Sequence, residues 1–142
     1  MAPSNVQDER VGAVCSFLGT VRSQNDGLHV SAMALEHYPG MTEKSIMAML
    51  NQAQDKFDIY AARVIHRIGD LMPGDQIVWV GVTSAHRGQS FQACEFLIDY
   101  LKTQAPFWKK EQTPSGARWV DARVSDDDAL SRWGIEVPRQ AI

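Results

Sequence analysis

The sequence is poor in cysteine, in lysine and in long apolar runs, and each scarcity excludes a class of protein. Its 142 residues include only two cysteines, Cys15 and Cys94, and no Cys-x-x-Cys pair. Both lie in apolar patterns, so reduced, buried thiols are expected rather than a disulfide framework. The longest apolar stretches, such as residues 77–82, fall far short of the ~18 residues that a membrane-spanning helix needs. A net charge of −3 argues against a nucleic-acid-binding protein, which needs clustered basic residues.

Further absences concern targeting, metals and domain number. The first ten residues are polar and acidic, so no signal peptide is predicted and the cytoplasm is the expected compartment. No linker or repeat divides the chain, which predicts a single domain over residues 1–124. An acidic tail follows over residues 125–142, and we expect it to form a short helix or to be mobile. No metal site is expected, because neither close pairing nor a suitable carboxylate spacing occurs around the four histidines, His29, His37, His66 and His86.

Hydrophobic periodicity predicts a mixed α+β fold. Segments rich in β-formers predict strands over residues 12–21, 28–37, 62–68 and 76–84, with a hairpin signal at residues 25–27. Apolar spacing predicts one helix over residues 42–57 and a second that carries the stripe 91–101 and stops before Pro106. A final hairpin is expected from residues 107–112 and 118–123. Several connections are too short for parallel crossovers, so the sheet is expected to be largely antiparallel.

Positive charge is concentrated in one region of the chain. Residues 86–123 hold six basic and four acidic side chains, so this segment carries +2 although the whole chain carries −3. Three of the five lysines, Lys102, Lys109 and Lys110, fall within nine residues. This local excess of cations is the feature that a functional interpretation has to explain.

His86 and Arg87 stand between the strongest predicted strand and the second helix. Free backbone N–H groups and the positive end of the helix dipole favour anions at such a position. Arg87 adds a bidentate donor for phosphate or carboxylate, and His86 adds a donor or an acid–base group. A solvated loop with an incidental arginine fits the same pattern, so both interpretations stay open on spacing alone.

Lys102 borders the apolar stripe of the second helix. A lysine whose stem covers the edge of a core is the commoner case. A partly buried lysine beside other cations, however, loses its proton more easily and can act as a nucleophile or general base. The segment 106–111 (PFWKKE) has two readings as well. It is either a solvated strand edge, or it brings Lys109 back over the Lys102 end of the helix to form a cationic pocket.

Several longer motifs carry a resemblance to a known family. They occur at residues 35–41 (LEHYPGM), 65–69 (IHRIG), 73–75 (PGD), 80–87 (VGVTSAHR), 99–102 (DYLK) and 105–111 (APFWKKE). In this order they resemble the MoaE family, the large catalytic subunits of molybdopterin synthase, and the match runs from about residue 12 to residue 123. Long motifs in one register are far more specific than a single short pattern.

The resemblance implies an enzyme of molybdenum-cofactor biosynthesis, a sulfurtransferase with an α/β hammerhead-type fold and an added small β subdomain. Family members convert cyclic pyranopterin monophosphate into molybdopterin by inserting two sulfurs as a dithiolene. The sulfur arrives as a thiocarboxylate on the C-terminus of a small ubiquitin-like subunit of the MoaD type. The implied assembly is a homodimer of large subunits with a small subunit at each end, a heterotetramer. No resident cofactor is expected.

The resemblance also assigns roles to particular residues. Lys102 matches the catalytic lysine and Lys109 its partner in the same pocket. The implied substrate-binding residues are Arg22, His86, Arg87, Lys110, Glu111, the pocket-lining Phe17, and Arg123 supplied by the other subunit. Thr20 departs from the family, where a lysine often stands. A non-catalytic module that binds a ubiquitin-like tail or a phosphorylated ligand through the same basic residues is the alternative function.

Overall fold

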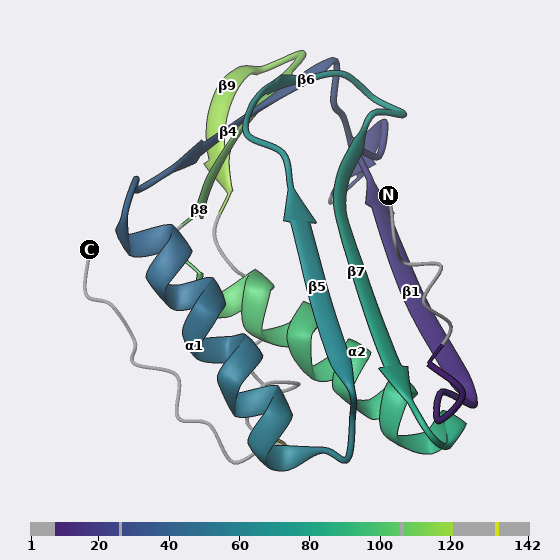
Figure 1. Cartoon of the computed structure of the whole chain (residues 1–142). Helices are drawn as coiled ribbons and strands as arrows, with labels where there is room; N and C mark the ends of the chain where they lie inside the picture. The colour runs from purple at the N-terminus through teal and green to yellow at the C-terminus, as the bar shows by residue number, and fades with distance from the viewer. Residues whose placement is uncertain (1–7, 26, 106, 121–132, 134–142) are drawn as a thin grey trace.

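The chain mixes strands and helices in an α+β order. The structure, a computed structural model, describes residues 8–25, 27–105, 107–120 and 133. The elements within them (Figure 1) are β1 (Ala13–Thr20), β2 (Gln24–Asn25), β3 (Leu28–His29), β4 (Ala32–His37), α1 (Met41–Lys56), β5 (Ala61–His66), β6 (Gly69–Leu71), β7 (Gln76–Ser84), α2 (Arg87–Thr103), β8 (Phe107–Thr113) and β9 (Gly116–Val120).

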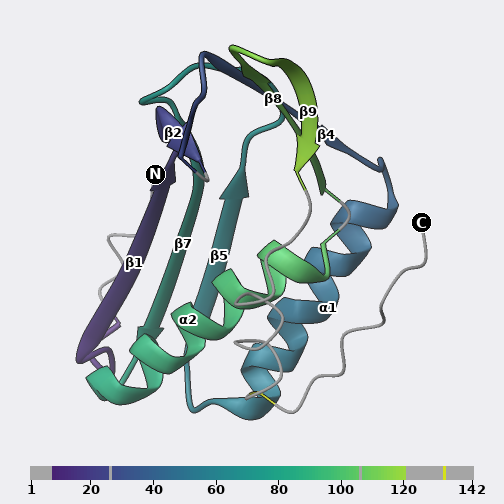
Figure 2. The ribbon, with the colours of Figure 1, turned by 180° about the vertical axis from the view of Figure 1, so that it is seen from behind.

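A three-stranded antiparallel sheet in the order β1-β7-β5 forms the body of the fold. The helices α1 and α2 pack on one face of this sheet, with α2 lying along it and α1 beside α2 (Figure 2). The main core forms between them, from Val80 and Val82 of β7, Phe96 and Leu97 of α2, and Met49 of α1. All five are almost completely buried, as expected for the side chains that supply most of the burial energy.

A second antiparallel sheet, in the order β6-β4-β8-β9, lies at one end of the first. Its own small core contains Val21, Met33, Leu35 and Leu71. Phe107, the first residue of β8, packs against both cores. The two sheets therefore meet where α2 ends and β8 begins.

The predicted class is confirmed, and most predicted elements appear within a few residues of their expected ends. The predicted single strand over residues 28–37 is wrong, because it is divided into β3 and β4. The hairpin signal at residues 25–27 does join two strands, but β2 and β3 have only two residues each. β1 pairs with β7 and β4 with β8, so the two long strands on either side of that hairpin belong to different sheets.

The tail and the membrane prediction concern different parts of the chain. Of residues 125–142, only Trp133 is described, so the predicted helix or mobile tail lies outside the described residues. Trp133 packs edge-on against Phe57 and Phe96, and its indole N–H donates to Asp99 at 2.8 Å.

Neither helix in the described part of the chain is long and apolar enough to cross a membrane.

Candidate active site

Lys102 and Lys109 lie on either side of a short connection between α2 and β8. Lys102 is in the last turn of α2, and only residues 104–106 separate the end of this helix from the start of β8. Of the two readings of Lys102, the structure of the single chain favours the commoner one, since its side chain is exposed beside the buried Leu101. Lys109, the third residue of β8, is exposed as well. The geometry therefore presents two cations at one end of the molecule, on two different elements.

His66 lies close enough to Lys109 to feel its charge. It ends β5, and its ring stacks on Phe107 with centroids 3.9 Å apart and planes 13° apart. Nδ1 of His66 donates to the carbonyl of Arg67 at 2.7 Å, because a carbonyl oxygen can only accept. Burial lowers the pKa of His66, and the positive charge of Lys109 lowers it further, against the hydrogen bond to Arg67. Burial and the charge of Lys109 therefore both favour the neutral form of this half-buried imidazole.

Lys110 points away from Lys109. Successive side chains of a strand lie on opposite faces of the sheet, so Phe107, Lys109 and Glu111 share one face of β8 and Lys110 lies on the other. Lys110 is paired across the ladder with Trp119 of β9, and its ammonium lies 5.6 Å from the centre of the indole. The lysine cluster counted along the sequence is therefore split between two faces, and Lys110 does not join Lys109 in one pocket wall.

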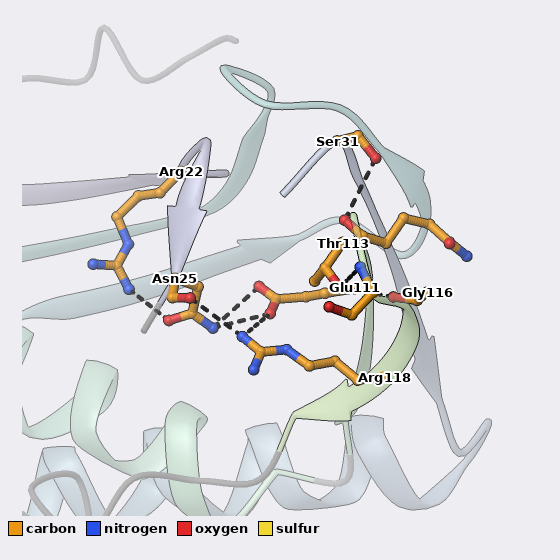
Figure 3. A network of polar contacts seen from close by, with 9 residues as sticks. Arg22, Asn25, Ser31, Glu111, Thr113, Gly116 and Arg118 are labelled. Carbon is orange, nitrogen blue, oxygen red and sulfur yellow. Dashed lines mark hydrogen bonds and ion pairs between the residues drawn. The ribbon is translucent and has the colours of Figure 1, made fainter. Parts of the chain in front are cut away.

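Arg22 and Glu111 are joined by a chain of polar contacts (Figure 3). Nη2 of Arg22 donates to Oδ1 of Asn25 at 3.4 Å, and Nδ2 of Asn25 donates to both carboxylate oxygens of Glu111 at 3.0 and 3.1 Å. Arg118 forms an ion pair with Glu111 at 3.2 Å. Glu111 is only 3% exposed. Its carboxylate is already engaged by Asn25 and Arg118, so its place in the fold favours holding other groups rather than binding substrate directly.

Neither Asn25 nor Arg118 was singled out by the sequence. Asn25 stands in a turn signal, where asparagine is expected for local reasons, and Arg118 stands in a predicted strand. The only sequence signal for their role is that Glu111, an acid, occupies an inward position of an alternating strand. Such a carboxylate needs partners from elsewhere in the chain.

Phe17 and Thr20 belong to β1. Phe17 is paired with Val80 and shares the helix-covered face of the sheet, where it remains 39% exposed. Thr20 ends the strand after an irregularity in the ladder and is exposed. Beyond it, Val21 is buried and exchanges backbone hydrogen bonds with residues 74 and 75 at 2.8 and 2.9 Å. These bonds fix the backbone immediately before Arg22.

His86 and Arg87 lie at the opposite end of α2 from Lys102. His86 is the N-cap of this helix and Arg87 its first residue, and both side chains are exposed. At 1.5 Å per residue, the 15 steps from Arg87 to Lys102 span roughly 22 Å. Arg87 and Lys102, which the resemblance assigns to the same site, therefore do not meet within one chain.

The end of α2 that carries His86 is built firmly onto the sheet. Ser84 is fully buried, and its hydroxyl donates to the carbonyl of His86 at 2.6 Å. The hydroxyl of Ser90 donates to the carbonyl of Arg87 at 3.0 Å. No acidic residue occupies the first turn of the helix. The free N–H groups of this turn and the guanidinium of Arg87 make the end suited to an anion.

Arg123 lies outside the described residues, so its predicted position near the site of a second chain is a prediction still. Across the described part of the chain, no group of three or more His, Cys, Asp or Glu side chains is placed to hold a metal ion.

Comparison with known proteins assigns the family. The family model described as "MoaE protein" matches residues 2–104. The chain belongs to the MoaE family. A curated MoaE relative from Ralstonia nicotianae, named molybdopterin synthase catalytic subunit, is 63% identical over 126 residues, which are 89% of this chain and 72% of the relative.

Solved MoaE-type structures have the same fold. The molybdopterin biosynthesis MoaE protein from Burkholderia ambifaria superposes with a TM-score of 0.76 at 52% identity, covering 91% of this chain and 84% of that one. The molybdopterin synthase from Staphylococcus aureus superposes with a TM-score of 0.75 at 31% identity, covering 82% and 85%. The arrangement of β1, β7 and β5 under α1 and α2, with the second sheet at one end, is thus the MoaE fold.

Proposed function

We propose that this chain is the catalytic subunit of a molybdopterin synthase. In this proposal it transfers sulfur from the thiocarboxylated C-terminus of a small ubiquitin-like subunit to cyclic pyranopterin monophosphate, and so forms the dithiolene of molybdopterin. The observation that carries the proposal is the placement of Lys102 and Lys109 on two sides of the connection 104–106 in a member of the MoaE family. We propose no resident cofactor.

The charges of the reactants explain why cations are needed. A cyclic phosphate and a thiocarboxylate are both anions, and bringing them together costs Coulomb energy in any site from which water is excluded. Lys102 and Lys109 offset that repulsion and stabilise the charge that develops as sulfur attacks. Lys102, exposed at the end of α2, is the group to which we assign proton transfer during sulfur addition and opening of the phosphate ring.

Two chains complete one site in this proposal. Arg87 lies too far from Lys102 for a single pterin monophosphate to touch both within one chain. A homodimer removes this difficulty, because each chain can lend His86 and Arg87 to the site of the other. Arg123 is proposed to be supplied in the same way.

The cysteines support an external sulfur donor. Cys94 is buried, and burial together with the neighbouring Cys15 raises its pKa to about 12. A thiol with such a pKa stays protonated at neutral pH and is a poor nucleophile. Sulfur brought by a partner makes an internal thiol relay unnecessary.

The test is reconstitution. The chain, a thiocarboxylated small subunit and cyclic pyranopterin monophosphate are combined, and molybdopterin is measured. Lys102→Ala is expected to lower turnover at least ~100-fold with an unchanged melting curve, whereas Lys44→Ala, which removes an exposed lysine of α1, is the matched control. Near-normal turnover of folded Lys102→Ala contradicts the assignment. Product formation by the wild-type chain also distinguishes an enzyme from the alternative, a non-catalytic binding module. Membership of the MoaE family already favours the enzyme.

A further inference from the structure

Glu111 is a carboxylate in an unusual place. Only 3% of the residue is exposed, although glutamate is almost never fully buried unless it is paired. Its partners come from two other segments, Asn25 in β2 and Arg118 in β9 (Figure 3). Nη2 of Arg118 also donates to the backbone carbonyl of Asn25 at 3.3 Å. Residues of the second sheet therefore form hydrogen bonds with both the side chain and the backbone of Asn25.

These contacts fix the orientation of the Asn25 amide. An ionised carboxylate only accepts hydrogen bonds, so the NH₂ group of Asn25 has to face Glu111. The amide oxygen, Oδ1, then points the other way, toward Nη2 of Arg22 at 3.4 Å. Since Asn25 is itself only 9% exposed, it has little freedom to turn.

Asn25 can orient the side chain of Arg22 and still leave most of its hydrogen-bond donors to a ligand. The contact with Oδ1 uses one of the five N–H donors of the guanidinium, and the side chain of Arg22 is exposed. Glu111 pairs with Arg118 and accepts from the NH₂ group of Asn25. The amide oxygen of Asn25, on the other side, can therefore accept from a second cation. Glu111 also shares its face of β8 with Lys109, which ties the direction of Arg22 to the strand that carries the lysine.

We propose that Asn25 is a positioning residue, which aims the guanidinium of Arg22 at the anionic substrate from a buried mount made by Glu111 and Arg118. This inference rests on the proposed function, in which Arg22 binds the phosphate or the pterin. A merely structural network stabilises the β2–β3 hairpin to the same degree whether or not Arg22 is present. The two roles therefore differ in their dependence on Arg22.

A double-mutant cycle measures that dependence. Asn25→Ala, Arg22→Ala and the double variant are reconstituted with thiocarboxylated partner, and KM for cyclic pyranopterin monophosphate and kcat are determined. Asn25→Ala is expected to raise KM about tenfold with little change in kcat. In the Arg22→Ala background the same substitution is expected to change neither value. Gln24→Ala, an exposed neighbour in the same hairpin, is the control and is expected to behave like the wild type.

The outcomes distinguish the two proposals. If Arg22→Ala lowers activity but Asn25→Ala raises KM by the same factor with and without Arg22, the positioning role is overturned and the proposed function stands. If Arg22→Ala leaves KM and kcat unchanged, the role of Arg22 fails and the positioning role with it, while the Lys102→Ala result still decides the proposed function. If Asn25→Ala does not fold, Asn25→Ser takes its place in the cycle. Its shorter side chain keeps a polar hydroxyl at the buried position but no longer reaches Arg22, so the same coupling is expected.

Discussion

Lys102 and Arg87 occupy opposite ends of α2, and this separation makes a mixing experiment decisive. The 15 helical steps from one to the other place the two positions roughly 22 Å apart along the helix. Lys102→Ala and Arg87→Ala chains are each expected to be inactive as homodimers. If each site takes Lys102 from one chain and Arg87 from the other, a mixed dimer holds one site with both changes and one site with neither.

The expected recovery follows from counting sites. When equal amounts of the two variants exchange subunits at random, about half of the dimers are mixed, and about a quarter of all sites are intact. Molybdopterin formation by the mixture is therefore expected to reach about a quarter of the wild-type rate per chain. The assay is the reconstituted reaction with saturating thiocarboxylated partner, measured before and after exchange of subunits.

A matched mixture supplies the control. Lys102→Ala combined with Lys109→Ala is expected to stay inactive after exchange, because both lysines belong to the same chain's site and every site in the mixture lacks one of them. Failure of the Lys102→Ala and Arg87→Ala mixture to recover, with mixed dimers demonstrated by mass, refutes the two-chain site. Full activity of Arg87→Ala alone refutes the role of Arg87 instead.

Three further predictions concern stability and thiol chemistry. Burial lowers the pKa of folded His66 below its ordinary 6.5, so the stability that the neutral ring contributes is complete above that pH and is lost as the pH falls through the pKa of the folded state. Below pH 6.5, the urea midpoint of unfolding should therefore fall less steeply with pH for His66→Phe than for the wild type. Equal pH dependence of the two midpoints contradicts the argument. Replacing both Cys15 and Cys94 with serine should spare turnover with preloaded partner, and loss of turnover in the folded variant indicates a thiol relay. In the wild type, iodoacetamide should label Cys94 only on unfolding. Trp133→Ala should lower the free energy of unfolding by about 3 kcal/mol through lost packing. Trp133→Phe should lower it by about 1 kcal/mol, because it removes only the hydrogen bond to Asp99. Denaturant titration measures both losses, and equal losses contradict the separation into packing and hydrogen bonding.

The helices and the longest strand could be predicted because their patterns are local. The apolar spacing of α1 and α2 repeats over four turns or more, and β7 was expected at residues 76–84, where it is found. The family motifs extended this to function, because they lie in one order along most of the chain. Periodicity and motif order do not depend on which segments meet in space.

Pairing between distant segments could not be predicted in the same way. β1 joins β7 and β4 joins β8, across long stretches of chain, and the cost of closing such loops leaves no local trace in the sequence. Asn25 and Glu111 are 86 residues apart. An asparagine in a turn and a glutamate in a strand each have an ordinary local explanation, so their common buried network appears only once the two segments are brought together.

Some errors about the site came instead from counting charges along the chain without regard to the period of each element. Lys109 and Lys110 are adjacent in sequence, yet a strand sends neighbours to opposite faces, and Lys110 lies over Trp119. Arg87 and Lys102 belong to one helix, yet a helix of this length keeps its ends apart. A local charge of +2 over residues 86–123 therefore describes several separate positions on the fold rather than one. In the proposed two-chain site, the two ends of α2 from different chains meet at one substrate, which is why the mixing experiment, and not a further single substitution, tests the site as a whole.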